Sequence, residues 1–279
     1  MEGLLPMDAK ELIRAGRLPE ARSQLIEEVK SSPADSGKRT LLFQVQIFFG
    51  QWDKAERHLD TIAAQDASKE AGAQVYKNLI QAERERSEVA KRNRRAEFLP
   101  QTPPYVETHY AAWQKVVDGQ LEEAQALFDR VVAQRPVISG TLDGKDFVGL
   151  KDTDTFLSPF LEAIIHERYV WIPFESIREL SVSPPKTLFD LIWTSARVTT
   201  WEGLTMNCYF PVLYPESFLH EDDRVKLGRM TDWTPLGGSF AKGVGQHVYQ
   251  IGEEDVAILE IQDALFKHPD PVESGENSD

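Results

Sequence analysis

Hydrophobic residues in the first half of the chain recur at helical spacing, and one set of positions returns three times. A glycine is followed by alanine at +5, a large apolar residue at +9 and, in two segments, proline at +17: Gly16, Ala21, Leu25 and Pro33; Gly50, Ala55, Leu59 and Ala67; Gly119, Ala124, Phe128 and Pro136. The first two glycines are 34 residues apart and the third lies 69 residues further, close to two periods. This is the spacing of tetratricopeptide repeats, which are pairs of helices joined by a turn. Glycine allows a positive φ in the turn, and the small alanine lets the two helices approach.

Between the second and third segments, Lys69–Glu97 has apolar residues at helical spacing and a charged end with opposite charges at i+3 and i+4. This pattern predicts one long helix in place of a degenerate repeat. Pro100, Pro103 and Pro104 then interrupt the chain, so we expect Phe98–Pro104 to be a rigid joint.

A helical repeat of this kind forms a concave groove that accepts an extended peptide or a helix. Within residues 41–49, the expected core positions are Leu42, Val45 and Phe49. Gln44, Ile47 and Phe48 lie on a neighbouring face, and we predict that they contact a partner in the groove. The alternative is that Ile47 and Phe48 pack on the adjacent long helix.

After Pro136 the pattern changes to short β-prone segments bounded by turns. Asp143-Gly144 predicts a hairpin turn, and Ser158–His166 predicts a short helix. Leu188–Trp193 is compatible with a helical turn or with the start of a strand. The predicted strands are Tyr169–Phe174, Ala196–Thr200, Cys208–Leu213 and Gln246–Ile251.

The predicted fold class is therefore α+β, with a tetratricopeptide-like helical domain over residues 1–136. A small β-rich domain over 137–268 is expected to be SH3-like, a bent sheet or a barrel. Residues 269–279 hold four acids, no bases and two prolines, which predicts an acidic disordered tail.

Composition and charge narrow the function classes. The chain has 279 residues, 41% of them hydrophobic, and no apolar run of membrane-spanning length, so we expect a cytoplasmic protein. Residues 1–139 hold 20 Lys and Arg against 21 Asp and Glu, whereas residues 140–279 hold 11 against 24. Nucleic-acid binding is disfavoured, because the strongly acidic second half repels the phosphate backbone. The basic cluster Lys91, Arg92, Arg94 and Arg95 is expected to be a solvated helix end, because acids surround it.

No chemical motif is complete. His166-Glu167 begins a zinc-protease pattern, but Val170 stands where the second histidine is required. Gly238–Gly243 has phosphate-loop spacing, but Val244 follows in place of lysine, which favours a turn between strands. We expect Asp152 and Asp154 to form a helix cap and a solvated turn rather than a calcium loop.

Other candidate groups also favour structural roles. The only cysteine, Cys208, is predicted to be buried and inert, and Arg229 to form a structural ion pair. The acidic loop around His220 is expected to be solvated rather than a cation site. The six histidines form no spaced pair, and most of the tryptophans 171, 193, 201 and 233 are expected in the core. We therefore predict no catalytic residue, no metal and no cofactor.

Five segments of the second half resemble the ImpE/SciE family of bacterial type VI secretion, which is also called TagJ. They are Tyr169–Phe174 with Ile177, Leu188–Trp193, Phe210–Pro215, Leu227–Trp233 and Gly243–Gln246. The resemblance extends over the chain to about Phe266. One departure is Phe189, which stands where the family pattern has arginine and so weakens any charged contact expected there.

The resemblance implies a helical N-terminal part, a small C-terminal β domain and a non-enzymatic role in the cytoplasm. It also implies binding to TssB, the small subunit of the contractile sheath, through an amphipathic helix. An indirect influence on the ATPase that disassembles the sheath is implied as well. Two other hypotheses stay open: a chaperone or adaptor for a secreted effector, and a hydrolase that uses carboxylates of the second half.

Overall fold

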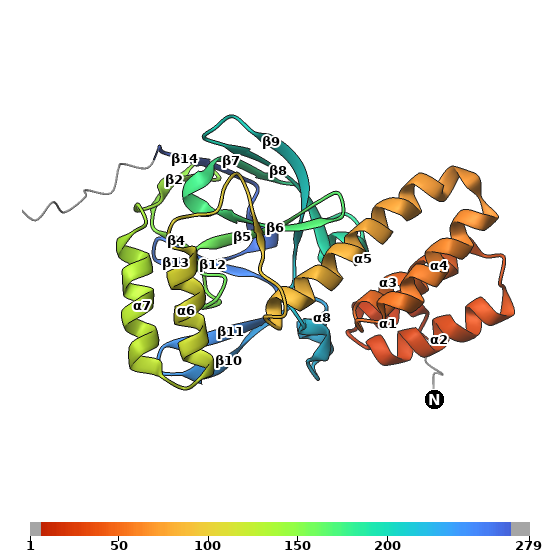
Figure 1. Ribbon diagram of the computed structural model, residues 1–279. Coiled ribbons are helices and arrows are strands. Elements are labelled where there is room, and N and C mark those ends of the chain that lie inside the picture. Colours follow the sequence, from red (N-terminus) through yellow and green to blue (C-terminus); the bar gives the residue numbers. More distant parts are fainter. Residues whose placement is uncertain (1–6, 269–279) are drawn as a thin grey trace, which may run out of the picture.

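The computed structural model describes residues 7–268, and helices make up its N-terminal half (Figure 1). They are α1 (Ala9–Arg14), α2 (Leu18–Ser31), α3 (Ser36–Ile47), α4 (Trp52–Gln65), α5 (Glu70–Ala90), α6 (Val106–Val117) and α7 (Leu121–Ala133). The turn glycines 16, 50 and 119 have φ of 74°, 63° and 73°, and the alanines at +5 are fully buried. The predicted long helix is α5, which ends immediately before the basic cluster.

The first two helix pairs and the third pair lie on different sides of the molecule (Figure 1). Helices α6 and α7 pack against the β-rich region, where Trp113 stacks on Phe156 with ring centroids 4.7 Å apart and Phe128 meets Phe240 at 5.5 Å. Between α5 and α6 the chain adds a two-residue strand, β1 (Glu97–Phe98), to the edge of the main sheet. The boundary at residue 136 stays a prediction.

The main sheet has nine strands in the order β1-β6-β5-β9-β8-β7-β14-β2-β3, and with two free ends it is open. Its other strands are β2 (Ser139–Leu142), β3 (Lys145–Val148), β5 (Phe160–Ile165), β6 (Arg168–Pro173), β7 (Ile177–Val182), β8 (Trp193–Thr200), β9 (Thr205–Pro211) and β14 (Asp263–Phe266). Two smaller sheets pair β10 (Thr231–Gly237) with β11 (Phe240–Gly245), and β12 (Val248–Ile251) with β13 (Glu254–Ala257) and β4 (Leu150–Asp152).

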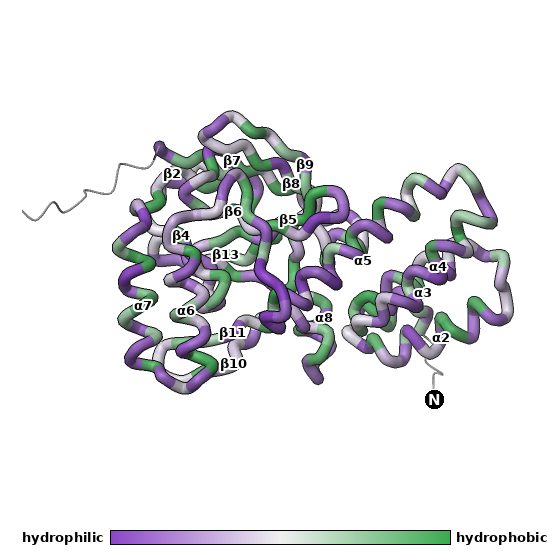
Figure 2. The backbone as a smooth tube through the Cα atoms, viewed as in Figure 1, coloured by the Kyte–Doolittle hydropathy of each residue, from purple (hydrophilic) through white to green (hydrophobic). Residues whose placement is uncertain are grey.

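Alternation along β5 divides the core into two layers. Phe160 and Ile164 face the core shared with the helices, whereas Leu161 and Ala163 face a second core among the strands. Figure 2 shows hydrophobic residues concentrated in these strands, while the outer helix α7 alternates between hydrophobic and polar positions. Because β5 is buried on both faces, a charged side chain on it needs a partner inside the protein.

The prediction of a helix over Ser158–His166 is wrong. The segment forms β5, which pairs with β6 and β9, and His166 takes a positive φ of 58° in the turn to β6. A short apolar run covered on both faces cannot be distinguished from a buried helix by periodicity alone.

The other strand predictions correspond to strands or parts of strands of the structure. The hairpin turn is confirmed, since Asp143 and Gly144 have φ of 48° and 83° between β2 and β3. Leu188–Trp193 contains both alternatives, a 3₁₀ turn (Leu188–Leu191) and the first residue of β8. Of the segment Gly238–Gly243, predicted as a turn between strands, residues 238 and 239 form the turn between β10 and β11, and the remaining four residues belong to β11. The predicted tail, 269–279, lies outside the described residues.

Candidate functional site

The three residues predicted to contact a partner are all buried. Gln44 is 8% exposed, and Ile47 and Phe48 are each 2% exposed. Ile47 and Phe48 border a small cavity together with Arg86 of α5 and Phe218 of the second half. The face expected to form an open groove is therefore covered by α5, as in the alternative above, and by the chain's own C-terminal half. Partner contact at these residues stays a prediction.

A segment between β9 and β10 contacts the turns of both N-terminal helix pairs. Phe218, in a 3₁₀ turn (Ser217–Leu219), packs edge-on against Trp52 with ring centroids 6.0 Å apart. A Cβ on Gly50 would lie 2.5 Å from the Phe218 ring, so only glycine fits there. In helix α8 (Asp223–Lys226), the Asp223 carboxylate accepts a 3.0 Å hydrogen bond from the Leu18 amide at the start of α2.

The ion pair predicted for Arg229 is wrong. Its guanidinium donates to the carbonyl oxygens of Ile13 and Arg14, at 3.0 and 2.7 Å. These carbonyls lie at the C-terminal end of α1, where a cation satisfies acceptors that the helix leaves free. Arg229 therefore ties the second half to α1.

Phe189 makes two aromatic contacts with the helices. Its ring stacks on Tyr76 of α5 at 3.9 Å and lies 5.0 Å from Phe43 of α3. Phe189 thus extends the core that the helices share with the second half.

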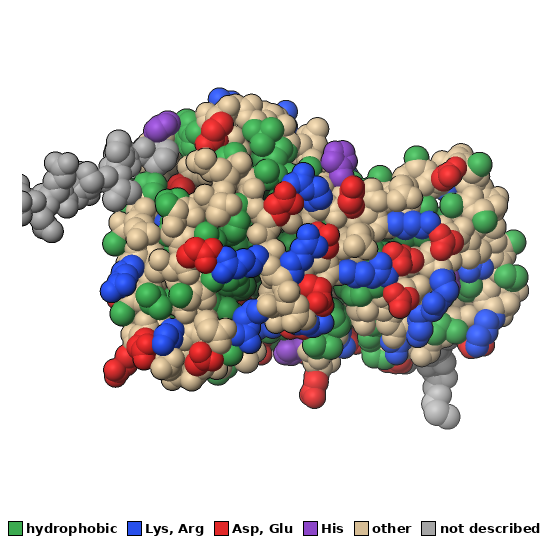
Figure 3. Space-filling model, viewed as in Figure 1, with side chains coloured by type: hydrophobic (Ala, Val, Ile, Leu, Met, Phe, Trp, Pro, Cys, Tyr) green, Lys and Arg blue, Asp and Glu red, His purple; other side chains and the backbone are tan. Residues whose placement is uncertain are grey.

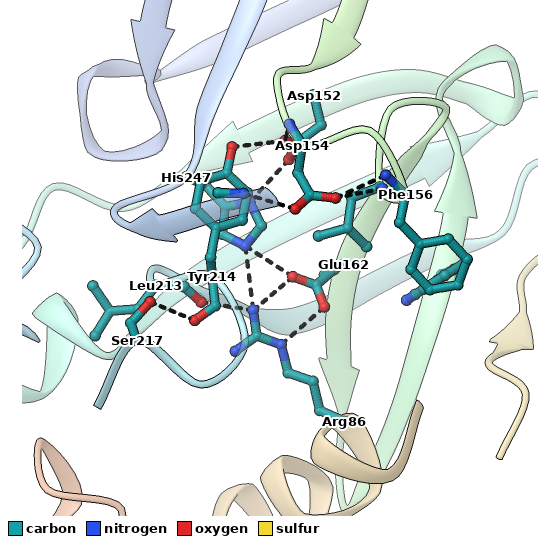
Figure 4. Close-up of polar contacts among 12 residues, drawn as sticks. Arg86, Asp152, Asp154, Phe156, Glu162, Leu213, Tyr214, Ser217 and His247 are labelled. Carbon is teal, nitrogen blue, oxygen red and sulfur yellow. Dashed lines mark hydrogen bonds and ion pairs between the residues drawn. The ribbon is translucent and has the colours of Figure 1, made fainter. Parts of the chain in front are cut away.

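The most densely connected polar cluster lies where α5 meets the main sheet (Figure 4). Arg86 donates two hydrogen bonds to the Glu162 carboxylate of β5, from Nε at 2.8 Å and from Nη2 at 2.6 Å. Nη2 also donates to the carbonyl oxygen of Leu213 at 2.6 Å, and Glu83 lies 3.4 Å from Nη1. Burial alone would raise the pKa of Glu162. The charge and hydrogen bonds of Arg86 have the larger effect and hold this pKa well below its usual range.

His247 joins this pair to a second carboxylate. Its Nδ1 is 2.9 Å from Asp152 and its Nε2 is 2.8 Å from Glu162. Two carboxylate acceptors on one imidazole require protons on both nitrogens. Burial alone would lower the pKa of His247, but the two carboxylates raise it to about 9, so the ring is an imidazolium at neutral pH.

The solvated turn predicted for Asp152 and Asp154 is wrong, because both side chains are buried. Asp152 also accepts from the Tyr214 hydroxyl at 2.7 Å. Asp154 accepts from three backbone amides, those of Phe156, Leu157 and Gly243, at 2.8 to 3.0 Å. Burial and the charge of Asp152 raise the pKa of Asp154 to about 6. Both aspartates bind parts of the β-rich region together rather than face water.

We call Arg86, Glu162, His247 and Asp152 the buried ion network. Its members come from α5, β5, β4 and the segment before β12, and each charge has an opposite charge within 3 Å. The four side chains are at most 4% exposed, and their contacts tie helix α5 to the strands. Within residues 7–268, no group of three or more His, Cys, Asp and Glu side chains has an arrangement suited to a metal ion.

Sequence reasoning missed this network, because its contacts join residues 76 to 95 positions apart. The one local signal is Glu162, the single charge inside the apolar run of β5. An ionisable side chain in a strand buried on both faces indicates an internal counter-ion.

The remaining candidates have ordinary structural environments. Cys208 is buried as predicted, and burial raises the pKa of its thiol to about 12. Trp171 and Trp193 are core residues, whereas Trp233 is 40% exposed. Two of the four residues of the basic cluster form ion pairs, Arg94 with Glu85 at 3.0 Å and Arg95 with Glu107. A cavity of about 250 Å³ lies between α7 and β4, bordered by Arg135, Lys151 and Ser239 among others.

Comparison with known proteins gives three findings. A model of the ImpE protein family matches residues 144–264. The chain is 33% identical over 270 residues, 97% of its length and 95% of the relative's, to the "Type VI secretion system accessory component TagJ" of Pseudomonas aeruginosa PAO1. The crystal structure of protein VPA1032 from Vibrio parahaemolyticus covers 93% of this chain and 97% of its own, with a TM-score of 0.83 and 20% identity. This last likeness shows a shared fold.

Among residues 7–268, none of the helices combines the length and the apolar character needed to cross a membrane.

Proposed function

The chain belongs to the ImpE/TagJ family, and from this premise we propose that it is an accessory component of type VI secretion that binds the small subunit of the contractile sheath. In this role it acts in the cytoplasm as an adaptor and not as an enzyme. The observation that carries the proposal is the 33% identity to TagJ over 97% of the chain. Identity spread over nearly the whole length supports a shared role of the entire molecule.

Helical recognition is part of the proposal. We infer that α1–α4 are tetratricopeptide-like, supported by the positive φ of Gly16 and Gly50 and the complete burial of Ala21 and Ala55. Such arrays bind amphipathic helices, and a helix of the small sheath subunit is the proposed ligand. By binding that helix, the protein would influence sheath assembly or disassembly. For the β-rich part, whose main sheet is open, we propose an SH3-like arrangement of bent sheets.

The buried ion network supports the non-enzymatic part of the proposal. Its ionisable groups are paired with one another and lie away from the surface, which suits rigidity better than turnover. Rigidity suits an adaptor, because a preorganised surface loses less conformational entropy on binding.

Calorimetric titration with the whole small sheath subunit and with its isolated N-terminal helix tests the proposal. Binding to both supports recognition of the helix, and binding to the whole subunit alone keeps the adaptor role but moves the contact elsewhere. A scrambled helix of equal charge is the control. If neither ligand binds, the sheath proposal is wrong, and an adaptor for a secreted effector is the alternative to test.

A further inference from the structure

A cavity of about 250 Å³ lies between helix α7 and the small sheet that contains β4 and β12, and we call it the α7–β4 cavity. Residues of α6, of β11 and of the segment between β4 and β5 complete its walls. Its volume is slightly below the range of about 300–1,000 Å³ for pockets that hold drug-sized ligands, so it suits a smaller molecule. Because the walls come from elements far apart in the sequence, the cavity is fixed by the fold and not by one loop.

The cavity has one apolar wall and one polar wall. The apolar wall consists of residues of α7 and of two other segments: Phe128, Val131, Val132, Pro159 and Phe240. On the polar wall are Lys151 of β4, Gln250 of β12 and Ser158. Lys151 and Gln250 are directly opposite each other in the β4–β12 pair, so their side chains lie on the same face of the small sheet. The lining therefore suits a molecule with an apolar body and a polar group at one side.

The polar wall keeps its hydrogen-bonding groups free. Within residues 7–268, the side chains of Lys151, Gln250 and Ser158 form no hydrogen bond and no ion pair. Lys151 is exposed, and Gln250 and Ser158 are half-buried, so solvent reaches all three residues. A ligand can therefore bond to them without first breaking a contact inside the protein.

Lys151 carries the unpaired charge of the lining. The second cation, Arg135, donates to the Glu175 carboxylate at 3.3 Å and is neutralised by it. The acid in the lining, Asp152, belongs to the buried ion network, and its side chain is 1% exposed. Burial lowers the pKa of His109 to about 4, so this ring is neutral at pH 7. A ligand thus meets one positive charge, two neutral hydrogen-bonding groups and no accessible acid.

The acids outside the lining leave this charge largely uncompensated. Asp129 of α7 lies outside the helix face that lines the cavity, and the charge of its neighbour Arg130 offsets it. Asp255 of β13 is opposite Gln250, which places it two strand spacings, or about 10 Å, from Lys151. At physiological ionic strength, salt largely screens exposed charges at that distance. Figure 3 shows acidic and basic side chains interspersed over α6 and α7, so a preference for one charge must come from the lining.

We propose that the α7–β4 cavity binds a small carboxylate that has an apolar body. The apolar wall on α7 holds the body, and the carboxylate accepts hydrogen bonds from the Lys151 ammonium, the Gln250 amide and the Ser158 hydroxyl. Hydrogen bonds between charged groups are stronger than neutral ones, which favours a carboxylate over a neutral acceptor of the same shape. Binding here does not require the proposed role at the sheath, so either proposal can fail without the other.

Benzoate, benzamide and benzamidine test the charge preference, because they share one ring and have a negative, a neutral and a positive head group at pH 7. Each probe is titrated into the full-length protein labelled with ¹⁵N, and the amide resonances of residues 150–152 and 248–251 report binding at the cavity. We expect saturable shifts with benzoate, an affinity about tenfold lower for benzamide, and the weakest binding for benzamidine.

Two pairs of variants locate the site. Lys151→Gln removes the free charge and should weaken benzoate binding about tenfold while leaving benzamide binding unchanged. Its control is Lys145→Gln, the same substitution at an exposed residue of β3 outside the cavity. Val132→Asp places a carboxylate at the rim, where the native side chain is 66% exposed, and should also weaken benzoate binding. Val117→Asp, at a 47% exposed residue of α6 that does not line the cavity, is its control.

Circular dichroism verifies that each variant is folded. Equal affinities for the three probes would show apolar contact alone, and the carboxylate assignment would be wrong. Benzoate shifts confined to other parts of the chain, or benzoate binding that Lys151→Gln leaves unchanged, would place the site elsewhere and overturn the proposal. Equal weakening by Lys151→Gln and Lys145→Gln would indicate a general charge effect, which overturns it as well. The absence of benzoate binding to the wild type would do the same.

Discussion

The buried ion network and the indole of Trp113 both lie where helices meet the β-rich region, but their polar groups are in opposite states. At Arg86 each donor that points to the sheet has an acceptor, and the neighbouring carboxylates share His247. On α6, the buried indole N–H of Trp113 has no acceptor among the described residues. Polar groups that are satisfied inside the protein hold the two halves together, whereas an unsatisfied donor adds nothing to that attachment. The comparison predicts a large loss of stability when a satisfied group is removed and a small loss when the unsatisfied donor is removed.

The largest effect is expected from Arg86→Ala. The substitution leaves Glu162 buried without its counter-ion, and removing one member of a buried pair costs about 3–5 kcal/mol of unfolding free energy. Arg84→Ala is the matched control, because Arg84 is on the same helix but pairs with Asp53 and Glu56 at the surface, where a pair is worth about 1 kcal/mol or less. Urea denaturation of both variants measures the difference. Equal losses would show that the network is not the tie between helices and sheet.

The pH dependence of stability tests the charge of His247. Its pKa in the folded protein is about 9, above the value of about 6.5 in an unfolded chain, so the folded state holds its proton more tightly. This contribution is fully present below about pH 6.5 and is lost as the pH rises toward 9. The shift corresponds to about 3 kcal/mol of unfolding free energy.

Urea denaturation at pH values from 6 to 9.5 should therefore show falling stability. In His247→Gln the decline over this range should be much smaller, because the titrating group is gone. A decline of equal size in this variant would contradict the assignment of an imidazolium between Asp152 and Glu162.

How much of the fold and of the site the sequence predicts depends on how far apart along the chain the contacting residues lie. The helix pairs follow from local rules: Gly16 takes the positive φ of the turn, and Ala21 is buried between the two helices that this turn joins. The ion network does not, because Arg86 is 76 positions from Glu162, His247 is 95 positions from Asp152, and nothing local distinguishes Arg86 and His247 from surface residues. The cover over the predicted groove is also non-local: the spacing identifies Phe48 at the end of α3, but not the distant Phe218 that borders the same cavity. In β5, burial of both faces removed the alternation that would have indicated a strand.

The smallest expected difference is the sharpest test of the comparison, because it contrasts the same substitution at two buried indoles. Trp193→Phe removes the donor that Glu83 accepts at 2.9 Å, whereas Trp113→Phe removes a donor that has no acceptor. Both variants lose similar packing volume, so the difference between them isolates the hydrogen bond. We expect Trp193→Phe to lose about 1.5–3 kcal/mol more unfolding free energy than Trp113→Phe, since a hydrogen bond to a charged acceptor is worth about that much. Equal losses in urea denaturation would show that the stability of the protein does not depend on the bond from Trp193 to Glu83. If Trp113→Phe were the less stable of the two, its N–H would have a partner inside the protein, and the contrast between satisfied and unsatisfied polar groups would not hold.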